Sequence, residues 1–254
     1  MHATKRETEI LNTVRLKGSV TTMELAEMLG VTDQTIRRNV IPLVERGLVK
    51  KVHGAIVAPD RLLEAPFHRR MLENQDAKQN LATVVAATIA DGDSIMLDAG
   101  STTSYVAQAL VDKKNLTVIT NSAQIASTLA PNPTNKVYFA GSELRSDDSA
   151  AFDAQALKTF NQFDVQYAIL SATALHAQRG IMVQKAHEAE LSRMLISRAS
   201  HVIVAADSTK FDRKSLISVC EFSDIQTLVS NEAPIGELAE ALETNNVFVS
   251  TPNT

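Results

Sequence analysis

Cysteine, long apolar runs and metal-ligand spacings are scarce in this chain of 254 residues, and each shortage excludes a class of protein. The single cysteine, Cys220, has no second thiol for an internal disulfide, as is typical of a reducing cytoplasm. Residues 1–17 contain no apolar segment, and no run of about 18 apolar residues occurs, so we expect neither an export signal nor a membrane span. Neither an H-x-x-x-H spacing nor a cysteine pair is present, so we predict no metal site and no cofactor.

The net charge of −4 is distributed unevenly along the chain. Residues 1–70 hold 12 Lys and Arg against 8 Asp and Glu, a balance of +4, whereas residues 71–254 hold 13 against 21, a balance of −8. A basic head on an acidic body concentrates the attraction for phosphate at one end of the chain. With 44% apolar residues, the chain is long enough for one large domain or two ordinary ones.

Residues 21–38 encode two short helices joined by a tight turn. Thr21 and Glu24 have the spacing of a capping box, which begins a helix, and Gly30 stands where a helix ends in a left-handed residue. Thr32 is then placed to cap a second helix that starts at Asp33. This pattern predicts a helix-turn-helix, and the alternative is a helical hairpin with a solvated charged face.

The second of these helices has a buried face and an opposite, polar face. Apolar residues at i, i+4 and i+7, beginning with Ile36, mark the buried face. Gln34 and Arg38 point away from it, and their side chains suit adenine and guanine in the major groove. Pro42 is expected to kink or stop the helix near Ile41, because proline disrupts the preceding turn.

A wing completes the head. A first helix is expected over 4–17, and the β-branched segments 47–53 and 55–57 read as a hairpin, which together make a winged helix-turn-helix. The basic wing residues are expected along the DNA backbone or in the minor groove, and the alternative is a solvated hairpin. The residues predicted to contact double-stranded operator DNA are Thr32, Gln34, Thr35, Arg37, Arg38, Lys50, Lys51 and His53.

Beyond a proline-bounded linker at 59–66, the chain alternates between helical and strand patterns. A helix is expected over 71–90, followed by strands at 95–97, 116–120, 137–140, 167–170, 202–206 and 247–249. Further helices are expected at 103–111, 123–129, 150–161, 188–200 and 234–242. Continuous apolar strands that alternate with helices indicate a doubly wound, mostly parallel α/β sheet covered on both faces.

Small polar residues follow four of these strands, at the edge where ligands bind in such folds. They lie at 98–103, 120–122, 141–145 and 207–210. Helix starts with hydroxyls and free amides bind anions, and carboxylates such as Asp98 and Asp207 suit sugar hydroxyls. The four loops together predict a site for a phosphorylated sugar or polyol, although each loop alone is equally well explained as a capped turn.

These residues resemble the DeoR family of bacterial transcriptional regulators over nearly the whole chain. The resemblance rests on Thr35-Ile-Arg-Arg38, Leu43, Gly47-Leu48, Lys51-Val-His-Gly54, Arg70, Asn74, Lys78, the loops at 98–103, 120–122 and 207–211, Gly141 and Glu188-Ala189. It implies a cytoplasmic repressor of sugar or polyol catabolism genes, a homodimer or homotetramer, that leaves its operator when a phosphorylated sugar binds. It also implies a sensor domain similar to ribose-5-phosphate isomerase and the CoA transferases.

The resemblance further implies that the loop 100–103 holds the phosphate of the effector. The residues predicted to bind the effector are Asp98, Gly100, Ser101, Thr102, Thr103, Asn121, Ser122, Gly141, Arg145, Lys185, Glu188, Asp207 and Lys210. Several positions depart from the family pattern: Asn39 and Val40 stand for Asp-Leu, Ala55 and Ser142 for glycines, and Asn231 for an aspartate. Ser142 places a side chain where backbone usually approaches the ligand.

We therefore predict a winged helix-turn-helix domain at 1–58, a linker and transmission segment at 59–78, and an α/β effector-sensing domain at 79–254. The alternative function is a sugar-phosphate isomerase-like enzyme of the same sensor fold, with Asp98, Lys185 or Glu188 as acid and base. The DNA-binding head favours the regulator over the enzyme, because an isomerase does not need it.

Overall fold

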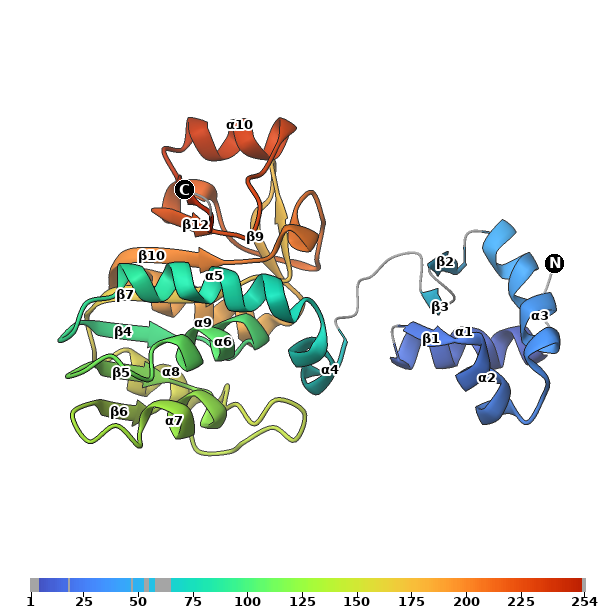
Figure 1. Cartoon of the computed structure of the whole chain (residues 1–254), viewed down its shortest axis with the longest axis horizontal. Coiled ribbons are helices and arrows are strands. Elements are labelled where there is room, and N and C mark those ends of the chain that lie inside the picture. The colour runs from blue at the N-terminus through green and yellow to red at the C-terminus, as the bar shows by residue number, and fades with distance from the viewer. Residues whose placement is uncertain (1–4, 18, 47, 53–54, 58–64, 253–254) are drawn as a thin grey trace. The chain divides into compact units, whose positions relative to one another are not determined.

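In the computed structural model of the chain, the described residues are 5–17, 19–46, 48–52, 55–57 and 65–252. They belong to two compact units, Met1–Pro66 and Phe67–Thr254, which divide within the segment 59–78 (Figure 1). Across the described ranges, no helix combines the length and the apolar character needed to cross a bilayer.

The first unit is a winged helix-turn-helix, as predicted. Its elements are α1 (Lys5–Lys17), β1 (Ser19–Thr21), α2 (Thr22–Leu29), α3 (Asp33–Glu45), β2 (Lys50–Val52) and β3 (Ala55–Val57). The wing strands β2 and β3 pair antiparallel, and β1, which was not predicted, pairs with the other side of β3. Ile10, Leu25, Ile36 and Ile56, each 0% exposed, bring the helices and the sheet into one core.

The turn between α2 and α3 has the predicted caps. The Thr21 hydroxyl accepts from the amide of Glu24 at 3.1 Å, and the Glu24 carboxylate accepts from the amide of Thr21 at 2.8 Å. Gly30 ends α2 with a φ of 62°, a left-handed conformation that costs glycine little. Thr32 caps α3 by accepting from the amide of Thr35 at 3.2 Å. Local hydrogen bonds therefore define both ends of the turn.

Pro42 does not end α3, so of the two outcomes predicted near Ile41, a kink or a stop, the stop is wrong. The helix continues through Pro42 to Glu45. An interior proline costs about 3 kcal/mol, because it lacks an amide donor and crowds the preceding turn. Val40 and Leu43, on either side of it, are 3% and 0% exposed. Their burial in the core holds both turns in place and offsets the cost.

The second unit is built on a seven-stranded sheet of order β13-β12-β10-β7-β4-β5-β6, with every neighbouring pair parallel. Its strands are β4 (Ser94–Leu97), β5 (Thr117–Thr120), β6 (Lys136–Phe139), β7 (Val165–Ser171), β10 (Ala199–Ala205), β12 (Thr227–Val229) and β13 (Phe248–Ser250). The helices are α4 (Phe67–Leu72), α5 (Gln75–Thr88), α6 (Ser101–Ala109), α7 (Ala123–Leu129), α8 (Ala154–Phe160), α9 (Ala186–Ser197) and α10 (Gly236–Thr244). The predicted doubly wound α/β fold is confirmed.

Alternate residues of the central strands bury both faces of the sheet. Along β4, Ile95 and Leu97 belong to one apolar cluster with residues of α5, α6 and α7, whereas Met96 belongs to another with residues of α8, α9 and α10. Figure 1 shows α5 and α6 in front of the sheet and α9 behind it. Helices on both faces leave the carboxyl edge of the sheet as the place for a ligand.

Several elements of the second unit differ from the predictions. The helix expected over 71–90 is two helices, α4 and α5, separated at Asn74, which has a left-handed φ of 53°. Helix α8 starts at Ala154 and not at 150, because Asp153 caps it by accepting from the amide of Ala156 at 2.8 Å. Strand β12 and a small antiparallel sheet were not predicted, since strands this short give little periodic signal. The small sheet consists of β11 (Ile217–Cys220), β9 (Gly180–Val183) and β8 (Ala174–His176).

Candidate DNA-reading helix and ligand site

Helix α3 turns two polar side chains toward solvent. Gln34 and Arg38 lie opposite the buried Ile36, and both are exposed. Within the described part of the chain, neither side chain has a hydrogen-bond or ion-pair partner. Arg37, on the flank, pairs with Asp33 at 2.6 Å. The outward face of α3 thus presents the donors and acceptors that base edges require.

The two threonines predicted to contact DNA have structural roles at the start of α3. Thr32 caps the helix, and its hydroxyl lies 2.9 Å from that of Thr35. The backbone carbonyl of Thr35 accepts from Nδ2 of Asn39 at 2.8 Å. This bond needs a donor, so the asparagine that replaces the usual family aspartate can form it and a carboxylate cannot.

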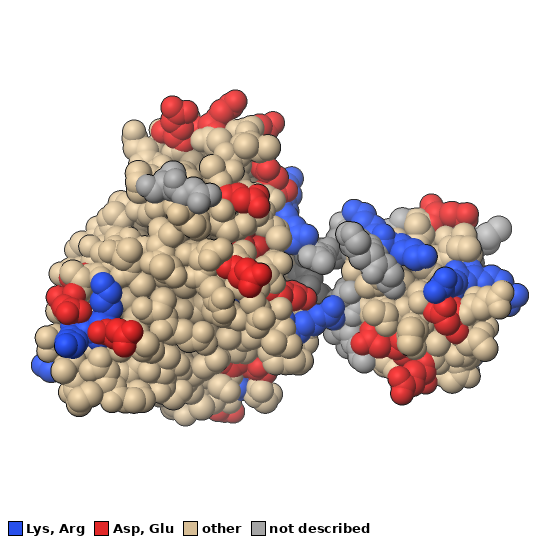
Figure 2. Space-filling view, in the orientation of Figure 1, with Lys and Arg blue, Asp and Glu red and all other residues tan. Residues whose placement is uncertain are grey.

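The wing adds positive charge to the first unit. Lys50 and Lys51 are both exposed on β2, and Lys51 borders a pocket beside α3. His53, the third predicted wing residue, lies outside the described residues. Figure 2 shows Lys and Arg interspersed with Asp and Glu on the visible face of the first unit, and acidic side chains over α10 of the second unit. The excess of basic residues in 1–70 favours phosphate contacts by the first unit.

The ligand residues predicted for the second unit gather at the carboxyl edge of its sheet. Asp207, Asp98 and Asn121 follow β10, β4 and β5, and β10 and β4 both pair with β7. Ser171, the last residue of β7, was not predicted. Its amide and hydroxyl donate to Oδ2 of Asp98 at 2.8 and 3.0 Å. A serine directly after the predicted strand 167–170 was the sequence signal that could have found it.

Three side chains at this edge each leave one buried acceptor atom without a hydrogen-bond partner among the described residues: Oδ1 of Asp98, Oδ1 of Asn121 and Oδ2 of Asp207. The opposite atom of each is used, since Nδ2 of Asn121 donates to the carbonyl of Ala151 at 2.8 Å and Oδ1 of Asp207 accepts from Nδ2 of Asn74 at 3.3 Å. A buried acceptor without a partner costs about 1–3 kcal/mol. A ligand with several hydroxyl donors would satisfy these atoms.

Asp98 is a carboxylate at this edge whose pKa is raised. Burial raises its pKa from 3.8 to about 6, against the hydrogen bonds from Ser171, which lower it. The negative charge of Glu188 adds to the increase. Glu188 therefore lies within electrostatic range of Asp98, as expected for two residues of one predicted site.

Helix α6 starts at the same edge, and within the described residues no N-cap side chain bonds to its first backbone amides. Its N-cap, Gly100, supplies no side chain, and Ser101, Thr102 and Thr103 are 5%, 5% and 0% exposed. The Thr103 hydroxyl donates to the carbonyl of Asp98 at 2.9 Å, which fixes the loop 98–103. A Cβ atom on Gly100 would lie 2.2 Å from Oγ of Ser171, so no larger residue fits there. Backbone amides at such a helix start bind phosphate.

Two of the predicted cationic residues are held in ion pairs with nearby carboxylates. Arg145 contacts Asp147 at 3.0 Å and Asp148 at 3.5 Å and also bonds to His187. Lys185 contacts Asp147 at 3.7 Å and Glu188 at 3.5 Å. Lys210 lies in the short helix at Ser208–Lys210, directly after Asp207. Arg145 and Lys185 thus belong to one charged cluster at the start of α9, whereas Lys210 lies in the segment that follows β10.

The buried Lys78 links the site to the start of the unit, and the predicted site did not include it. It is 3% exposed, and its Nζ donates to the carbonyls of Arg70 and Glu73. Burial lowers its pKa from 10.5 to about 8, while the negative charge of Asp207 acts in the opposite direction. Lys78 has the helical spacing of the buried Leu81 and Val85 on α5, and this spacing could have predicted from the sequence that it is buried.

Two departures from the family pattern are explained by contacts within the protein. The hydroxyl of Ser142 donates to Oδ2 of Asp153 at 2.7 Å, and the backbone amide of Ser142 donates to the same atom at 2.9 Å. Oδ1 of Asn231 accepts from the amide of Ser208 at 2.8 Å. Both side chains therefore support the loops around the site. Gly141 has a φ of 136°, and a Cβ there would lie 2.1 Å from that of Ala151.

The structure gives little support for a metal site or a reactive thiol. Within the described ranges, no group of three or more His, Cys, Asp and Glu is arranged to hold a metal ion. Burial raises the pKa of the Cys220 thiol to about 12, so it is protonated and unreactive at neutral pH. The His187 ring lies against Phe152, with ring centroids 4.6 Å apart and ring planes tilted by 56°.

Comparison with known proteins agrees with this two-part arrangement. The DeoR-like helix-turn-helix domain matches residues 6–61, and the DeoR C-terminal sensor domain matches residues 73–232. The chain belongs to the DeoR family of transcriptional regulators. Among the solved structures it resembles is ribose 5-phosphate isomerase A from Neisseria gonorrhoeae, at 15% identity and a TM-score of 0.40 over 54% of this chain and 53% of that one.

Curated members of the family match this chain over most of its length. The glycerol-3-phosphate regulon repressor of Escherichia coli (strain K12) is 29% identical over 97% of this chain and 98% of the repressor. The glycerol-3-phosphate regulon repressor of Haemophilus influenzae is 30% identical over 93% of this chain and 92% of that repressor. The transcriptional regulator IolR of Bacillus subtilis is 25% identical over 85% and 86%. Relatives of this kind indicate a DNA-binding regulator rather than an enzyme.

Proposed function

We propose that this DeoR-family protein is a repressor that leaves its operator when a phosphorylated polyol or sugar binds at the carboxyl edge of the second unit. The observation that carries the ligand class is the set of buried acceptors without partners on Asp98, Asn121 and Asp207. Acceptors of this kind bind hydroxyl groups, and several of them at neighbouring strand ends suit a molecule with several hydroxyls.

The start of α6 supplies the place for the phosphate. Its amides lie beside Asp98 and carry no side-chain cap, so an anion placed there faces free donors and the positive end of the helix dipole. Two relatives are named as repressors of the glycerol-3-phosphate regulon, and glycerol 3-phosphate is a phosphorylated polyol. Their names therefore support a phosphorylated polyol as the ligand of this chain. The remaining predicted residues follow β5, β6 and β10 or lie at the start of α9, and this placement supports the same edge as their site.

The enzyme alternative has less support. Lys185 and Glu188, two of the three groups assigned to acid–base chemistry, pair with each other at 3.5 Å, and Oδ2 of Asp98 is engaged by Ser171. A regulator needs a site that binds its effector without converting it chemically. We expect incubation of the full chain with pentose and hexose phosphates to leave them unchanged, as measured by ³¹P NMR, and turnover would favour the enzyme.

The full chain tests the proposed function in two steps. Thermal denaturation with a panel of phosphorylated polyols and sugars should identify a compound that raises the melting temperature, because a ligand that binds the folded state stabilises it. The unphosphorylated counterparts and inorganic phosphate alone are the controls. The same compound should then weaken binding to a DNA duplex that the protein has selected from a random library. A stabilising compound that leaves DNA affinity unchanged would contradict the coupling.

Control of two DNA half-sites requires two heads, so we propose a homodimer or homotetramer in the cytoplasm. Half-sites one helical turn apart lie about 34 Å from each other, and a ligand acts by changing the spacing of the heads. Light scattering of the full chain with and without its duplex measures the number of copies. A single copy on the duplex would contradict this assembly.

A further inference from the structure

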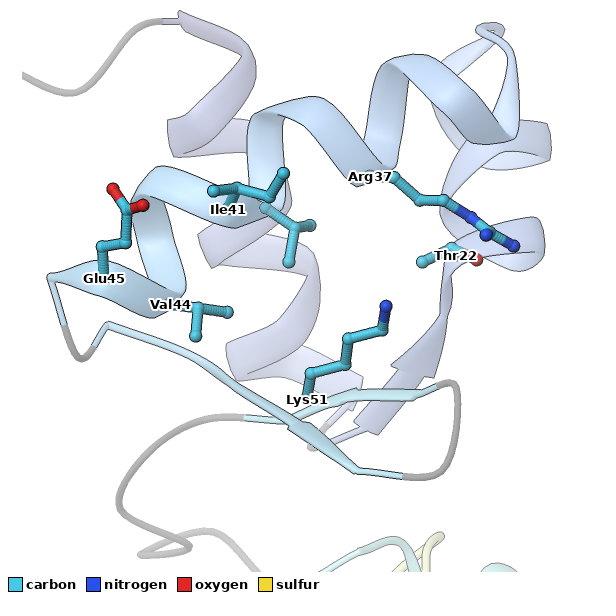
Figure 3. A pocket seen from close by; sticks show the side chains of 7 residues that line it. Thr22, Arg37, Ile41, Val44, Glu45 and Lys51 are labelled. Atoms are coloured by element: carbon cyan, nitrogen blue, oxygen red, sulfur yellow. The ribbon is translucent and has the colours of Figure 1, made fainter.

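An apolar pocket lies between α3 and β2 in the first unit (Figure 3). Its volume is about 180 Å³, and its lining residues are Thr22, Arg37, Val40, Ile41, Val44, Glu45 and Lys51. Ile41 and Val44 are 56% and 39% exposed. Two apolar side chains are thus exposed beside polar neighbours on the recognition helix. Packing within the first unit does not cover them, so we expect a binding partner to do so.

Ile41 lies on the outward stripe of α3 that also carries Gln34. Seven residues separate them, which at about 100° per residue brings them within about 20° of each other around the helix. The same separation is about 10.5 Å along the axis, or roughly three base-pair steps of B-DNA. Because α3 continues through Pro42, Ile41 faces the same groove as Gln34, a few base pairs away.

The charges around the pocket indicate what lies against Ile41. Figure 3 shows Arg37 and Lys51 extending toward the end of the pocket where Thr22 lies, while Glu45 stands at the opposite end. An occupant must therefore combine negative charge at one end with an apolar group at the other. A DNA strand does so, with a phosphate near Lys51 and near Arg37, whose exposed guanidinium also pairs with Asp33, and with a base edge at Ile41.

Thymine is the base that matches an isoleucine. Thymine also presents its O4 acceptor in the major groove, but it is the one base of DNA whose major-groove edge carries a methyl group, and an isoleucine can pack against that group. We propose that Ile41 selects a thymine of the operator by packing against its 5-methyl group. This assignment rests on the proposed operator binding and adds to it one specificity-determining residue.

Deoxyuridine tests the assignment, because it differs from thymidine in this methyl group alone. The full chain first selects a duplex from a random library, and each thymine of that duplex is then replaced singly by deoxyuridine. For the wild type, one replacement, or one symmetric pair, should weaken binding about fourfold, as expected for one buried methyl group. Ile41→Ala should bind both duplexes equally, whereas the control Leu48→Ala, exposed outside the pocket, should keep the fourfold difference.

A second variant gives a positive readout. Ile41→Asn should select adenine at the thymine position in a repeated library selection, because asparagine pairs with adenine, while the rest of the selected sequence stays the same. Equal deoxyuridine effects in wild type and Ile41→Ala, or an unchanged base preference of Ile41→Asn, would overturn the assignment while leaving operator binding intact. If the wild type selects no duplex, operator binding itself fails and the assignment with it. Self-association lost in Ile41→Ala would show instead that a second copy occupies the pocket.

Discussion

In the first unit, the side chains proposed to read DNA stand in solvent, since Gln34 and Arg38 are exposed on α3. In the second unit, the side chains proposed to bind the effector are buried, because Asp98, Asn121 and Asp207 are 7%, 0% and 1% exposed. Exposed polar groups are hydrated before binding and cost the fold little. Buried acceptors without partners reduce the stability of the unliganded fold.

This difference predicts opposite relations between binding and stability in the two units. A substitution on the outward face of α3 should lose DNA affinity without changing the free energy of unfolding. A substitution that removes a buried charge from the sheet edge should lose ligand affinity and increase the stability of the unliganded fold. The buried acceptors of the second unit thus lower the stability of the unliganded fold, and a bound ligand would restore it. Single-residue variants test this for the second unit and test the opposite expectation for the first unit.

The pH dependence of stability should show the largest effect. Because burial raises the pKa of Asp98 from 3.8 to about 6, the folded protein keeps a proton that the unfolded chain has released. The stability contributed by protonated Asp98 is present below about pH 4 and is lost as the pH rises through about 6, at most about 3 kcal/mol in total. Asp98→Asn does not titrate. Its free energy of unfolding in urea, minus that of the wild type, should therefore increase over this pH range.

The control for this series is Asp112→Asn, which removes an exposed carboxylate from the same unit. A difference between Asp98→Asn and wild type that stays constant from about pH 4 to 7 would show that Asp98 is not destabilised by burial, and the contrast between the units would lose its main support.

Ligand binding should show the next largest effect. Asp98→Asn keeps an oxygen for the amide of Ser171 but replaces the unpartnered acceptor with a donor. A lost hydrogen bond to a charged group costs about 1.5–3 kcal/mol, so the affinity for the stabilising sugar or polyol phosphate should fall about 10- to 150-fold at pH 7. Isothermal titration measures it. Unchanged affinity in Asp98→Asn would place the hydroxyls of the ligand elsewhere.

On the output side, Arg38→Ala should weaken operator binding about 5- to 150-fold, the value of one bidentate base contact. Arg38 is exposed, so the melting temperature and the ligand-induced stabilisation should stay at wild-type values. Arg179→Ala, which removes an exposed arginine from the second unit, is the matched control for lost charge. An equal loss in both variants would mean that charge alone, and not base recognition, accounts for the effect.

The first unit could be predicted almost completely from its sequence, because its determinants are local. The capping box joins residues three apart, and Gly30 and Thr32 act within one turn. The errors lay where tertiary packing overrides local preference. Burial of Val40 and Leu43 carries α3 through Pro42, and pairing with β3 makes a strand of residues 19–21.

The sheet edge could be predicted as a set of loops but not as a set of contacts. Asp98 and Asp207 follow strands that are predictable from the sequence, yet the partner of Asp98 is Ser171, 73 residues away. The order β10-β7-β4 depends on long-range packing and does not follow from periodicity. The ion pairs of Arg145 and the burial of Lys78 depend on the same long-range arrangement, so the sequence could not show which cations face a ligand.

The smallest effect is expected at Ser142, where the family usually has glycine. Its hydroxyl donates to Asp153, which also caps α8, and hydrogen bonds from Glu143, Ser142 and Ala156 hold the pKa of Asp153 well below its usual range. Ser142→Ala removes one of these bonds, so we expect a loss of about 0.5–1.5 kcal/mol in the free energy of unfolding. Ligand affinity should change less than twofold, because the hydroxyl is engaged with Asp153. A larger gain in affinity would show that the serine hydroxyl narrows the site.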